Sequence, residues 1–312
     1  MKNLQGRTAF ITGGASGIGL GMAEAFASAG MRIVIADINA DSLEKASADL
    51  RSAGATVMPV MLDVTQLEAW ASVAERVEAE FGSVDLLCNN AGMGQGRIAY
   101  NQHYTLTDIS PELWRLLFET NVSSVYHGIK TFAPRMGANG KGGHIVNTSS
   151  MAGLLAPPGM AVYAATKFAV LGLSESVRAE LQPHGIGVSV LCPGGVQSNL
   201  VATSASIRRA SEGANAGMHA AMDTAAPSVH VMMLARKVGD RVLKAVLDDE
   251  LYILTHPEYA PLVTERFDSI LSAIGESAQQ GYADTPASLQ RSRSPIYQEL
   301  ASRLRTNKGT PA

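Results

Sequence analysis

The sequence contains few of the residues that several common kinds of site require. It has two cysteines, Cys88 and Cys192, and seven scattered histidines, none of them spaced as zinc ligands. Both cysteines end apolar runs that are typical of buried strands. We therefore expect two free buried thiols in a reducing cytoplasm, with no disulfide framework and no metal site.

Excess positive charge and long apolar runs are also missing. The formal net charge is −3, so the chain lacks the basic signature of proteins that bind nucleic acid or anionic membranes. No apolar run reaches the roughly 18 residues that span a bilayer, and the N-terminal residues lack the apolar core of a signal peptide. We expect a small-molecule partner and no nucleic-acid or membrane partner.

What the sequence does contain indicates an α/β protein. Apolar residues make up 46% and charged residues 17% of 312 residues, which suits one large domain. Short runs rich in Val and Ile alternate with amphipathic helical stretches, which favours a parallel sheet with helices on both faces. The predicted strands are residues 7–12, 32–37, 56–62, 84–90, 143–149 and 187–192, with 251–255 as a possible seventh.

Three segments interrupt this alternation. Residues 93–110 form a long polar and aromatic connection, and residues 199–230 are rich in Ala, Ser, Gly and Met with weak periodicity. Loops of this length in compact domains are commonly functional, so we expect both to border a substrate site. Residues 276–312 are polar and predict an extended arm after a single domain that covers residues 1–275.

A glycine-rich turn follows the first predicted strand and opens a helix. The stretch reads TGGASGIG over residues 12–19. Glycines in this context allow a sharp turn and a close approach of a pyrophosphate, which the amides of the helix N-terminus can bind. The motif therefore predicts a dinucleotide site.

Asp37 ends the second predicted strand and indicates which dinucleotide is bound. A carboxylate here can accept hydrogen bonds from the adenosine ribose and would repel a 2′-phosphate, so we expect NAD rather than NADP. The alternative is that Asp37 only caps the following helix, although Asn39 or Asp41 can also fill that role.

The stretch YAATK places Tyr163 and Lys167 four residues apart, on one face of a helix. An isolated pair with this spacing is commonly a surface tyrosine beside a solvated lysine. Near a reacting group, however, a lysine ammonium would favour phenolate and lower a tyrosine pKa from about 10. Which interpretation holds depends on the residues around the pair.

Seven motifs in order make the sequence resemble the short-chain dehydrogenase/reductase family over residues 5–200. They are TGGASGIG at 12–19, LDV at 62–64, NNAG at 89–92, Asn121, IVNTSS at 145–150, YAATK at 163–167 and PGGVQS at 193–198. The resemblance implies a Rossmann fold, a doubly wound parallel sheet of about seven strands. It also implies a homodimer or homotetramer, formed through the helices at 111–135 and 161–182.

The resemblance also implies catalytic roles. Ser150 would hold the substrate oxygen, with Ser149 as the alternative serine. Tyr163 would transfer the alcohol proton, Lys167 would lower the pKa of Tyr163 and bind the nicotinamide ribose, and Asn121 would hold a water molecule.

The implied cofactor contacts follow the ends of the strands. They are Gly13, Ser16, Gly17, Ile18, Gly19, Asp37, Asp63, Val64, Asn90, Ala91, Gly92, Tyr163, Lys167, Pro193, Gly194, Val196 and Ser198.

The C-terminal part departs from the ending that many members of the family share. The two long loops resemble instead those of bacterial dehydrogenases of bulky aromatic secondary alcohols, such as lignin-derived benzylic alcohols. The side chains expected to wall the substrate are Met93, Tyr100, His103, Tyr104, Met151, Leu154, Leu155, Met160, Met218 and Met222. A hydroxysteroid dehydrogenase is the enzymatic alternative, and a dinucleotide-sensing regulator is the non-enzymatic one.

Overall fold

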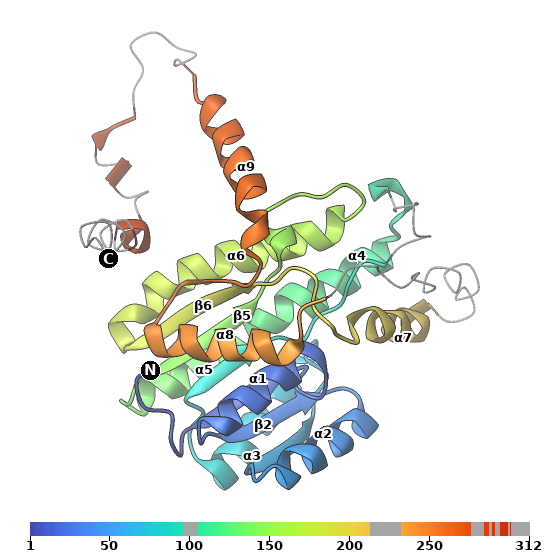
Figure 1. Cartoon of the computed structure of the whole chain (residues 1–312), viewed down its shortest axis with the longest axis vertical. Helices are drawn as coiled ribbons and strands as arrows, with labels where there is room; N and C mark the ends of the chain where they lie inside the picture. The colour runs from blue at the N-terminus through green and yellow to red at the C-terminus, as the bar shows by residue number, and fades with distance from the viewer. Residues whose placement is uncertain are drawn as a thin grey trace.

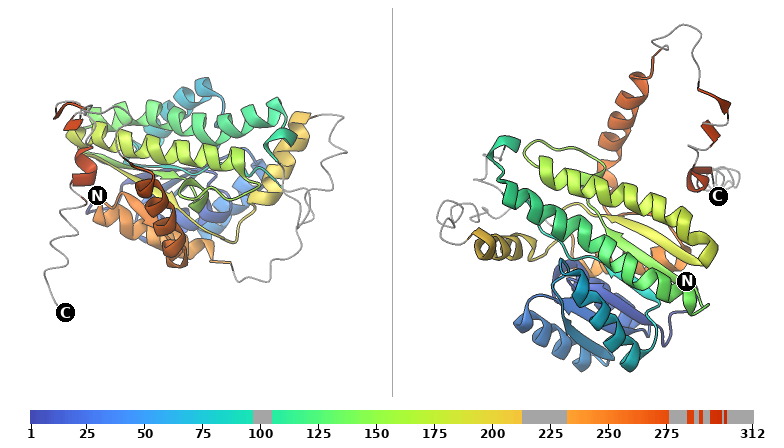
Figure 2. Two further views of the ribbon diagram at one scale, coloured as in Figure 1. Left: turned by 90° about the horizontal axis from the view of Figure 1, so that it is seen from above. Right: turned by 180° about the vertical axis from the view of Figure 1, so that it is seen from behind.

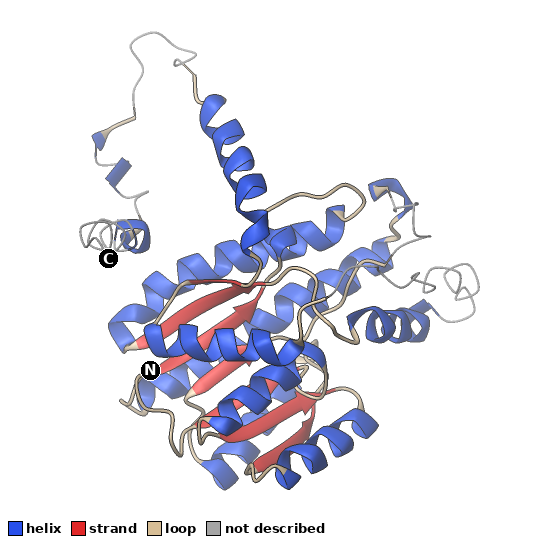
Figure 3. Ribbon diagram, viewed as in Figure 1, coloured by secondary structure: helices blue, strands red, loops and turns tan. Residues whose placement is uncertain are grey.

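A parallel sheet forms the centre of the molecule (Figure 3). The computed structural model describes residues 1–96, 105–212, 232–275, 284–286, 289–290, 294–298 and 300. Within these ranges the strand order is β3-β2-β1-β4-β5-β6-β7, and every pairing is parallel. The strands are β1 (Thr8–Thr12), β2 (Arg32–Asp37), β3 (Val57–Met61), β4 (Leu86–Asn89), β5 (Gly143–Thr148), β6 (Ile186–Cys192) and β7 (Tyr252–Leu254). The predicted doubly wound parallel sheet, including its seventh strand, is confirmed.

Helices cover both faces of this sheet (Figures 1 and 2). One layer consists of α1 (Gly17–Ser28), α2 (Ala40–Ser52) and α8 (Ala235–Asp248), and the other of α3 (Leu67–Phe81), α4 (Pro111–Phe118), α5 (Ser124–Ala138) and α6 (Ala161–Leu181). None of the helices in the described ranges has both the length and the apolar character needed to cross a membrane.

Two apolar clusters fasten these layers to the sheet. On the α1 side, Met22 and Phe26 pack with Val242 of α8. On the other side, the rings of Phe10 and Phe132 lie 4.9 Å apart, with Trp70 next to both. Each fully buried side chain of this size contributes roughly 1.5–3 kcal/mol, which makes the sheet a rigid base for the loops at its edge.

The sheet order places the site. Because β1 lies between β2 and β4, the chain leaves the sheet in opposite directions after β1 and after β4, and ligands of such sheets bind outside this switch point. The glycine turn follows β1, the NNAG segment ends β4, and Ser150 follows β5. Predicted site residues distant in sequence therefore meet at one edge.

The second predicted loop differs from the structure. Residues 200–212 form a helix, α7 (Leu200–Glu212), where the weak apolar periodicity predicted an irregular segment. In the first predicted loop, residues 106–108 form a short 3₁₀ turn, η1 (Leu106–Asp108). Five of the expected wall residues lie outside the described residues: Tyr100, His103, Tyr104, Met218 and Met222.

After β7 the chain forms η7 (Pro257–Tyr259) and α9 (Ala260–Ser272), which extends away from the sheet (Figure 1). The division at residue 275 stays a prediction. Ile296, beyond that division, is 2% exposed and belongs to an apolar cluster with Leu251 and Val190, so part of the C-terminal segment packs on the domain.

Candidate active site

The phenol of Tyr163 lies beside the hydroxyl of Ser150. Tyr163 is in the first turn of α6, and Ser150 begins the short turn η3 (Met151–Gly153) directly after β5. The Ser150 hydroxyl lowers the pKa of Tyr163, but burial of the phenol has the larger effect and raises that pKa. Ser149, in contrast, donates its hydroxyl to the carbonyl of Lys167 at 2.7 Å. Of the two candidate serines, Ser150 is therefore the one that acts on the phenol.

Lys167 lies one turn further along α6, on the same side as Tyr163. Its Nζ donates to the carbonyl of Thr148 at 3.0 Å and lies 5.6 Å from the centre of the Tyr163 ring. Burial lowers the pKa of Lys167 to about 8, although the nearby Cys192 opposes this shift. An amine with this pKa changes its charge near neutral pH. The two side chains are neighbours, as the spacing predicted.

The predicted lowering of the Tyr163 pKa is wrong for the chain by itself. The charge of Lys167 is apparent from the sequence, whereas burial of the phenol, which raises its pKa, is a property of the folded chain. The lysine's own ammonium form is also disfavoured by burial, which weakens the charge on which that argument depended.

Asn121 lies in a single π-helical turn, η2 (Glu119–Ser123), between α4 and α5. Its Oδ1 accepts from the amide of Met93 at 2.8 Å, and its Nδ2 donates to the Met93 carbonyl and to Thr166 Oγ1. π turns inside α-helices are frequent at functional sites. The amide thus ties the segment after β4 to α6, and its role in holding a water molecule stays a prediction.

The glycine turn has the shape that a pyrophosphate requires. Gly17 has φ +49°, and a Cβ on Gly19 would lie 2.0 Å from the carbonyl oxygen of Gly13. Ser16 is the N-cap residue of α1, but its side chain makes no capping hydrogen bond, so the first amides of α1 are not capped by that hydroxyl. Ser198 lies opposite the turn, 2.8 Å from a Cβ placed on Gly17. The residues present fit a dinucleotide.

Asp37 points at this turn. Its Oδ2 accepts from the amide of Ala15 at 3.3 Å, and its Oδ1 accepts from the amide of Asn39 at 3.1 Å. The N-cap of α2 is Asn39, whose Oδ1 accepts from Ser42. The alternative that Asp37 serves as this cap is therefore excluded.

Asn90 and Ala91 brace the turn from β4. Both of their amides donate to Thr12 Oγ1, at 2.9 and 3.0 Å, and Asn90 Nδ2 donates to the carbonyl of Thr12. A Cβ on Gly92 would lie 3.1 Å from Asn121 Oδ1 and 3.5 Å from Lys167 Nζ. This segment therefore connects the predicted cofactor turn to the predicted catalytic residues.

The other predicted contacts lie at strand ends. Asp63 accepts from the amide and hydroxyl of Thr65, and the carbonyl of buried Val64 accepts from Trp70 Nε1. Ile18 packs against the apolar cluster on the α1 side. Val196 forms an isolated bridge with Met233.

His256 was not singled out from the sequence, yet it supports the turn after Pro193. The amide of Gly194 donates to His256 Nδ1 at 3.0 Å, and Nε2 contacts the carbonyl of Gly195 at 3.2 Å. Since Nδ1 accepts, Nε2 carries the proton and donates. No local sequence pattern links residues 194 and 256, so only the tertiary structure could reveal this contact.

Gln95 was also missed, and it contacts the helix of Tyr163 directly. Its Oε1 accepts from the amides of Val162 and Tyr163, at 3.0 and 3.1 Å, and its Nε2 donates to the carbonyl of Gly159. The side chain is 2% exposed.

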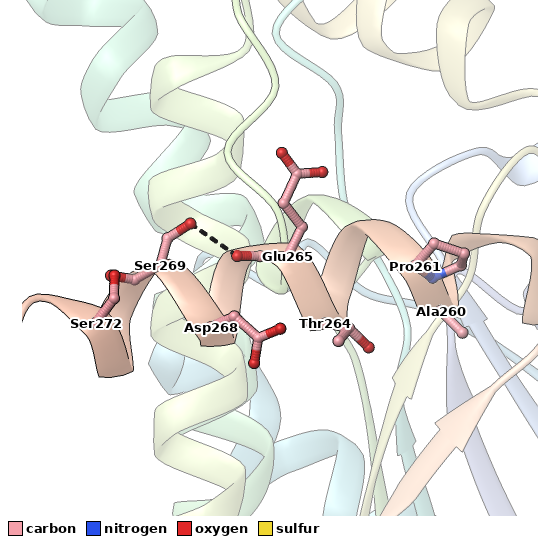
Figure 4. A pocket seen from close by; sticks show the side chains of 7 residues that line it. All are labelled: Ala260, Pro261, Thr264, Glu265, Asp268, Ser269 and Ser272. Atoms are coloured by element: carbon pink, nitrogen blue, oxygen red, sulfur yellow. Dashed lines mark hydrogen bonds between the residues drawn. The ribbon is translucent and has the colours of Figure 1, made fainter.

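A hollow of about 770 Å³ lies along α9 (Figure 4). It is an open surface lined by residues of that helix: Ala260, Pro261, Thr264, Glu265, Asp268, Ser269 and Ser272. The Ser269 hydroxyl donates to the carbonyl of Glu265 within the helix. Because a single helix supplies the whole lining, we place the chemistry at Tyr163 instead.

Comparison with known proteins agrees with this geometry. A family model described as short chain dehydrogenase matches residues 7–208. The C alpha-dehydrogenase of Sphingobium sp. is 36% identical over 286 residues, which cover 90% of this chain and 91% of that protein. The 1-deoxy-11-beta-hydroxypentalenate dehydrogenase of Streptomyces exfoliatus is 33% identical over 268 residues, which cover 86% and 90%.

A solved structure is similar over nearly the whole domain. The short-chain dehydrogenase/reductase from Burkholderia phymatum in complex with NAD is 33% identical, with a TM-score of 0.76, and the match covers 90% of this chain and 100% of that one. The expected resemblance to bacterial dehydrogenases is confirmed by the similarity to the Sphingobium protein. The chain belongs to the short-chain dehydrogenase/reductase family.

Proposed function

We propose that this protein is an NAD(H)-dependent oxidoreductase that interconverts a secondary alcohol and its ketone. The observation that carries the proposal is the position of Lys167 Nζ, 5.6 Å from the centre of the Tyr163 ring on the same face of α6, with Ser150 beside the phenol and the glycine turn at the same sheet edge. The dehydrogenase relatives and the NAD complex of a similar protein support this choice.

The proposed residues divide the chemistry between them. NAD⁺, when bound, accepts the hydride from the alcohol carbon. The Ser150 hydroxyl holds the alcohol oxygen, and the Tyr163 phenolate removes the hydroxyl proton as the carbon–oxygen double bond forms. In ketone reduction the same phenol returns the proton. A base positioned in this way contributes about 10²- to 10⁴-fold to the rate.

Lys167 and Asn121 have supporting roles in this proposal. Burial lowers the pKa of Lys167 to about 8. Other charges at the site can therefore change whether the amine is protonated. When protonated it stabilises the phenolate and binds the nicotinamide ribose. Asn121, which fixes Met93 and Thr166, keeps the lysine side of the site in place and holds the water through which protons reach solvent.

For the substrate we propose a bulky, largely apolar secondary alcohol that carries an aromatic ring. Met151 and Leu154 directly follow Ser150 and are buried in an apolar cluster, and Met93 is buried beside Asn121. Such side chains suit apolar rings better than a sugar, which requires converging polar groups. The similarity to a C alpha-dehydrogenase supports the same class.

The test is NAD reduction with a panel of aliphatic, benzylic, steroidal and sugar alcohols. We expect kcat/KM to be highest for a 1-arylpropanol. A steroid that is oxidised faster would favour the hydroxysteroid alternative, and no NADH with any alcohol would favour a dinucleotide-sensing regulator. A sugar alcohol or 2-propanol as best substrate would contradict the bulky aromatic class alone.

We also propose a cytoplasmic homodimer or homotetramer. Cys88 and Cys192 are buried free thiols, which suit a reducing compartment. The helices α4 and α5, predicted to lie in the interface, expose Trp114 and Tyr126. Sedimentation analysis tests the assembly, and a monomer at micromolar concentration would contradict it.

A further inference from the structure

Gln95 joins the segment after β4 to the start of the catalytic helix. One buried side chain satisfies three backbone groups: the amides of Val162 and Tyr163 and the carbonyl of Gly159. Its two accepted hydrogen bonds are to consecutive amides in the first turn of α6. One of these amides belongs to Tyr163 itself.

The helix needs this acceptor because it begins without a cap of its own. Its N-cap position is Met160, whose side chain makes no capping hydrogen bond. Amides in the first turn of a helix have no partner within the helix. Leaving a buried amide without an acceptor is destabilising, so the first turn would shift to find another partner and Tyr163 would move with it.

The segment that carries Gln95 is itself held in place. The amide and carbonyl of Met93 are both bound by Asn121, and the amide of Gly94 donates to Ser204 Oγ of α7 at 2.8 Å. Gln95 therefore reaches α6 from a fixed position, at the base of the loop expected to border the substrate.

The uncharged amide is chemically significant. In the described part of the chain, two titratable groups lie near Tyr163: Lys167, 5.6 Å from the ring centre, and Cys192, which interacts with Lys167. An acidic cap, common at helix N-termini, would add a negative charge near the phenol and oppose formation of phenolate. A glutamine supplies the same acceptor without that charge.

We propose that Gln95 is a positioning residue that caps the catalytic helix with a neutral acceptor and holds the Tyr163 phenol in place against Ser150. This proposal rests on the acid–base function proposed for Tyr163. Gln95 would thus contribute to catalysis by positioning Tyr163, without touching the reacting atoms.

Two variants separate the hydrogen bonds from the charge. Gln95→Met keeps the length of the side chain but removes the acceptor, so we expect kcat to fall about 10- to 100-fold while KM for NAD stays within about twofold. Gln95→Glu keeps the acceptor for both amides, adds charge and loses the donor to the Gly159 carbonyl. We expect its kcat plateau within about threefold of wild type, but the acidic limb of the pH profile for alcohol oxidation moved up by about one pH unit.

Gln182→Glu is the matched control, since it adds the same charge at the exposed far end of α6. This position is about 30 Å along the helix from Tyr163. We expect no shift of its pH profile. A Gln95→Met chain with kcat within about threefold of wild type overturns the capping role. An unmoved limb in Gln95→Glu, or an equal shift in Gln182→Glu, overturns the role of neutrality.

A second readout does not depend on turnover. The ionisation of Tyr163 is measured by phenolate absorbance during a pH titration. The absorbance of the same chain carrying Tyr163→Phe is subtracted, which leaves the contribution of Tyr163. Gln95→Glu should raise this transition by about one pH unit, even if no alcohol in the panel is a substrate. If the wild-type chain is inactive but Gln95→Glu shifts the ionisation of Tyr163, the proposed reaction is wrong and the positioning role of Gln95 stands. If neither activity nor the shift is observed, the positioning role is wrong as well. Because Gln95→Glu keeps both accepted hydrogen bonds, it remains informative if Gln95→Met does not fold.

Discussion

At the scale of single residues, burial shifts the pKa values of the two main groups of the site, Tyr163 and Lys167, in opposite directions. Burial raises the pKa of the Tyr163 phenol and lowers the pKa of Lys167 to about 8. In both cases the neutral form is favoured, because a charged group loses hydration when it is buried. The chain therefore presents a neutral phenol beside an amine that loses its proton near pH 8, and ionisation of Tyr163 depends on Ser150 and on the charges beside it.

Replacing Tyr163 by Phe tests the acid–base role. Phenylalanine keeps the buried ring and removes only the hydroxyl beside Ser150. We expect the fold and NAD binding to be kept and kcat to fall at least about 10²-fold, the lower end of what a positioned base contributes. Tyr126→Phe, which removes a hydroxyl from a half-exposed ring on α5, serves as control. Activity within a few-fold of wild type in Tyr163→Phe would disprove the mechanism.

Asp37 should determine the choice between NAD and NADP. The carboxylate accepts from the amide of Ala15 in the glycine turn, and a 2′-phosphate near it would be repelled. We expect kcat/KM for NAD to exceed that for NADP by about 100-fold, which corresponds to about 3 kcal/mol. The double change Asp37→Ser with Ile38→Arg should move the preference towards NADP, since Ile38 is half-exposed beside it.

The control for this test is Asp41→Ser, which removes an exposed acid from the first turn of α2. Its cofactor preference should match that of the wild-type chain. Equal kcat/KM for the two cofactors in the unmodified protein would show that Asp37 does not face the ribose.

At the scale of secondary structure, the glycine turn between β1 and α1 has no room for a side chain at Gly19. A Cβ on Gly19 would lie 2.0 Å from the carbonyl of Gly13. Gly19→Ala should therefore displace the turn and abolish measurable NAD binding. Gly137→Ala, in α5 where a Cβ would meet nothing within 4 Å, should leave binding unchanged and stabilise the fold by up to about 1 kcal/mol. Calorimetric titration with NAD and urea unfolding measure the two effects, and tight binding by Gly19→Ala would refute the turn as the cofactor site.

The elements also show what could be predicted from the sequence and why. The seven strands and the pair of Tyr163 and Lys167 were predictable because buried strands and one-turn spacings leave local patterns. The helix α7 was missed because it begins a segment rich in Ala, Ser and Gly that has few large apolar residues. The contacts of Gln95 and His256 join residues about 60 or more positions apart, so no local pattern records them. The direction of the Tyr163 pKa depends on burial, which is a tertiary property.

At the scale of the whole molecule, a polar cluster connects strands β5 and β6 to both helix layers. Arg178 of α6 forms a two-bond ion pair with Asp249, which follows α8, and also donates to the carbonyl of Val188 in β6. His144 of β5 lies in the same cluster, with Nε2 2.8 Å from Ser189 Oγ. Because Ser189 donates to the carbonyl of Glu250, the histidine must donate to Ser189 through Nε2.

The last prediction follows from this cluster and concerns stability in acid. Burial lowers the pKa of His144 to about 3, although Asp249 opposes the shift, whereas an unfolded histidine has a pKa of about 6.5. Protons therefore bind the unfolded chain more readily. The stabilisation is fully present above pH 6.5 and is lost as the pH falls from 6.5 towards 3. By this linkage His144 alone should reduce the free energy of unfolding by about 2 kcal/mol between pH 7 and pH 5.

Urea unfolding of His144→Gln, whose amide can still donate to Ser189, should show a correspondingly smaller loss over that interval. His184→Gln, which replaces an exposed histidine beyond the end of α6, should lose stability as the wild type does. If the difference between wild type and His144→Gln were the same at pH 7 and pH 5, His144 would not be held neutral in the folded chain.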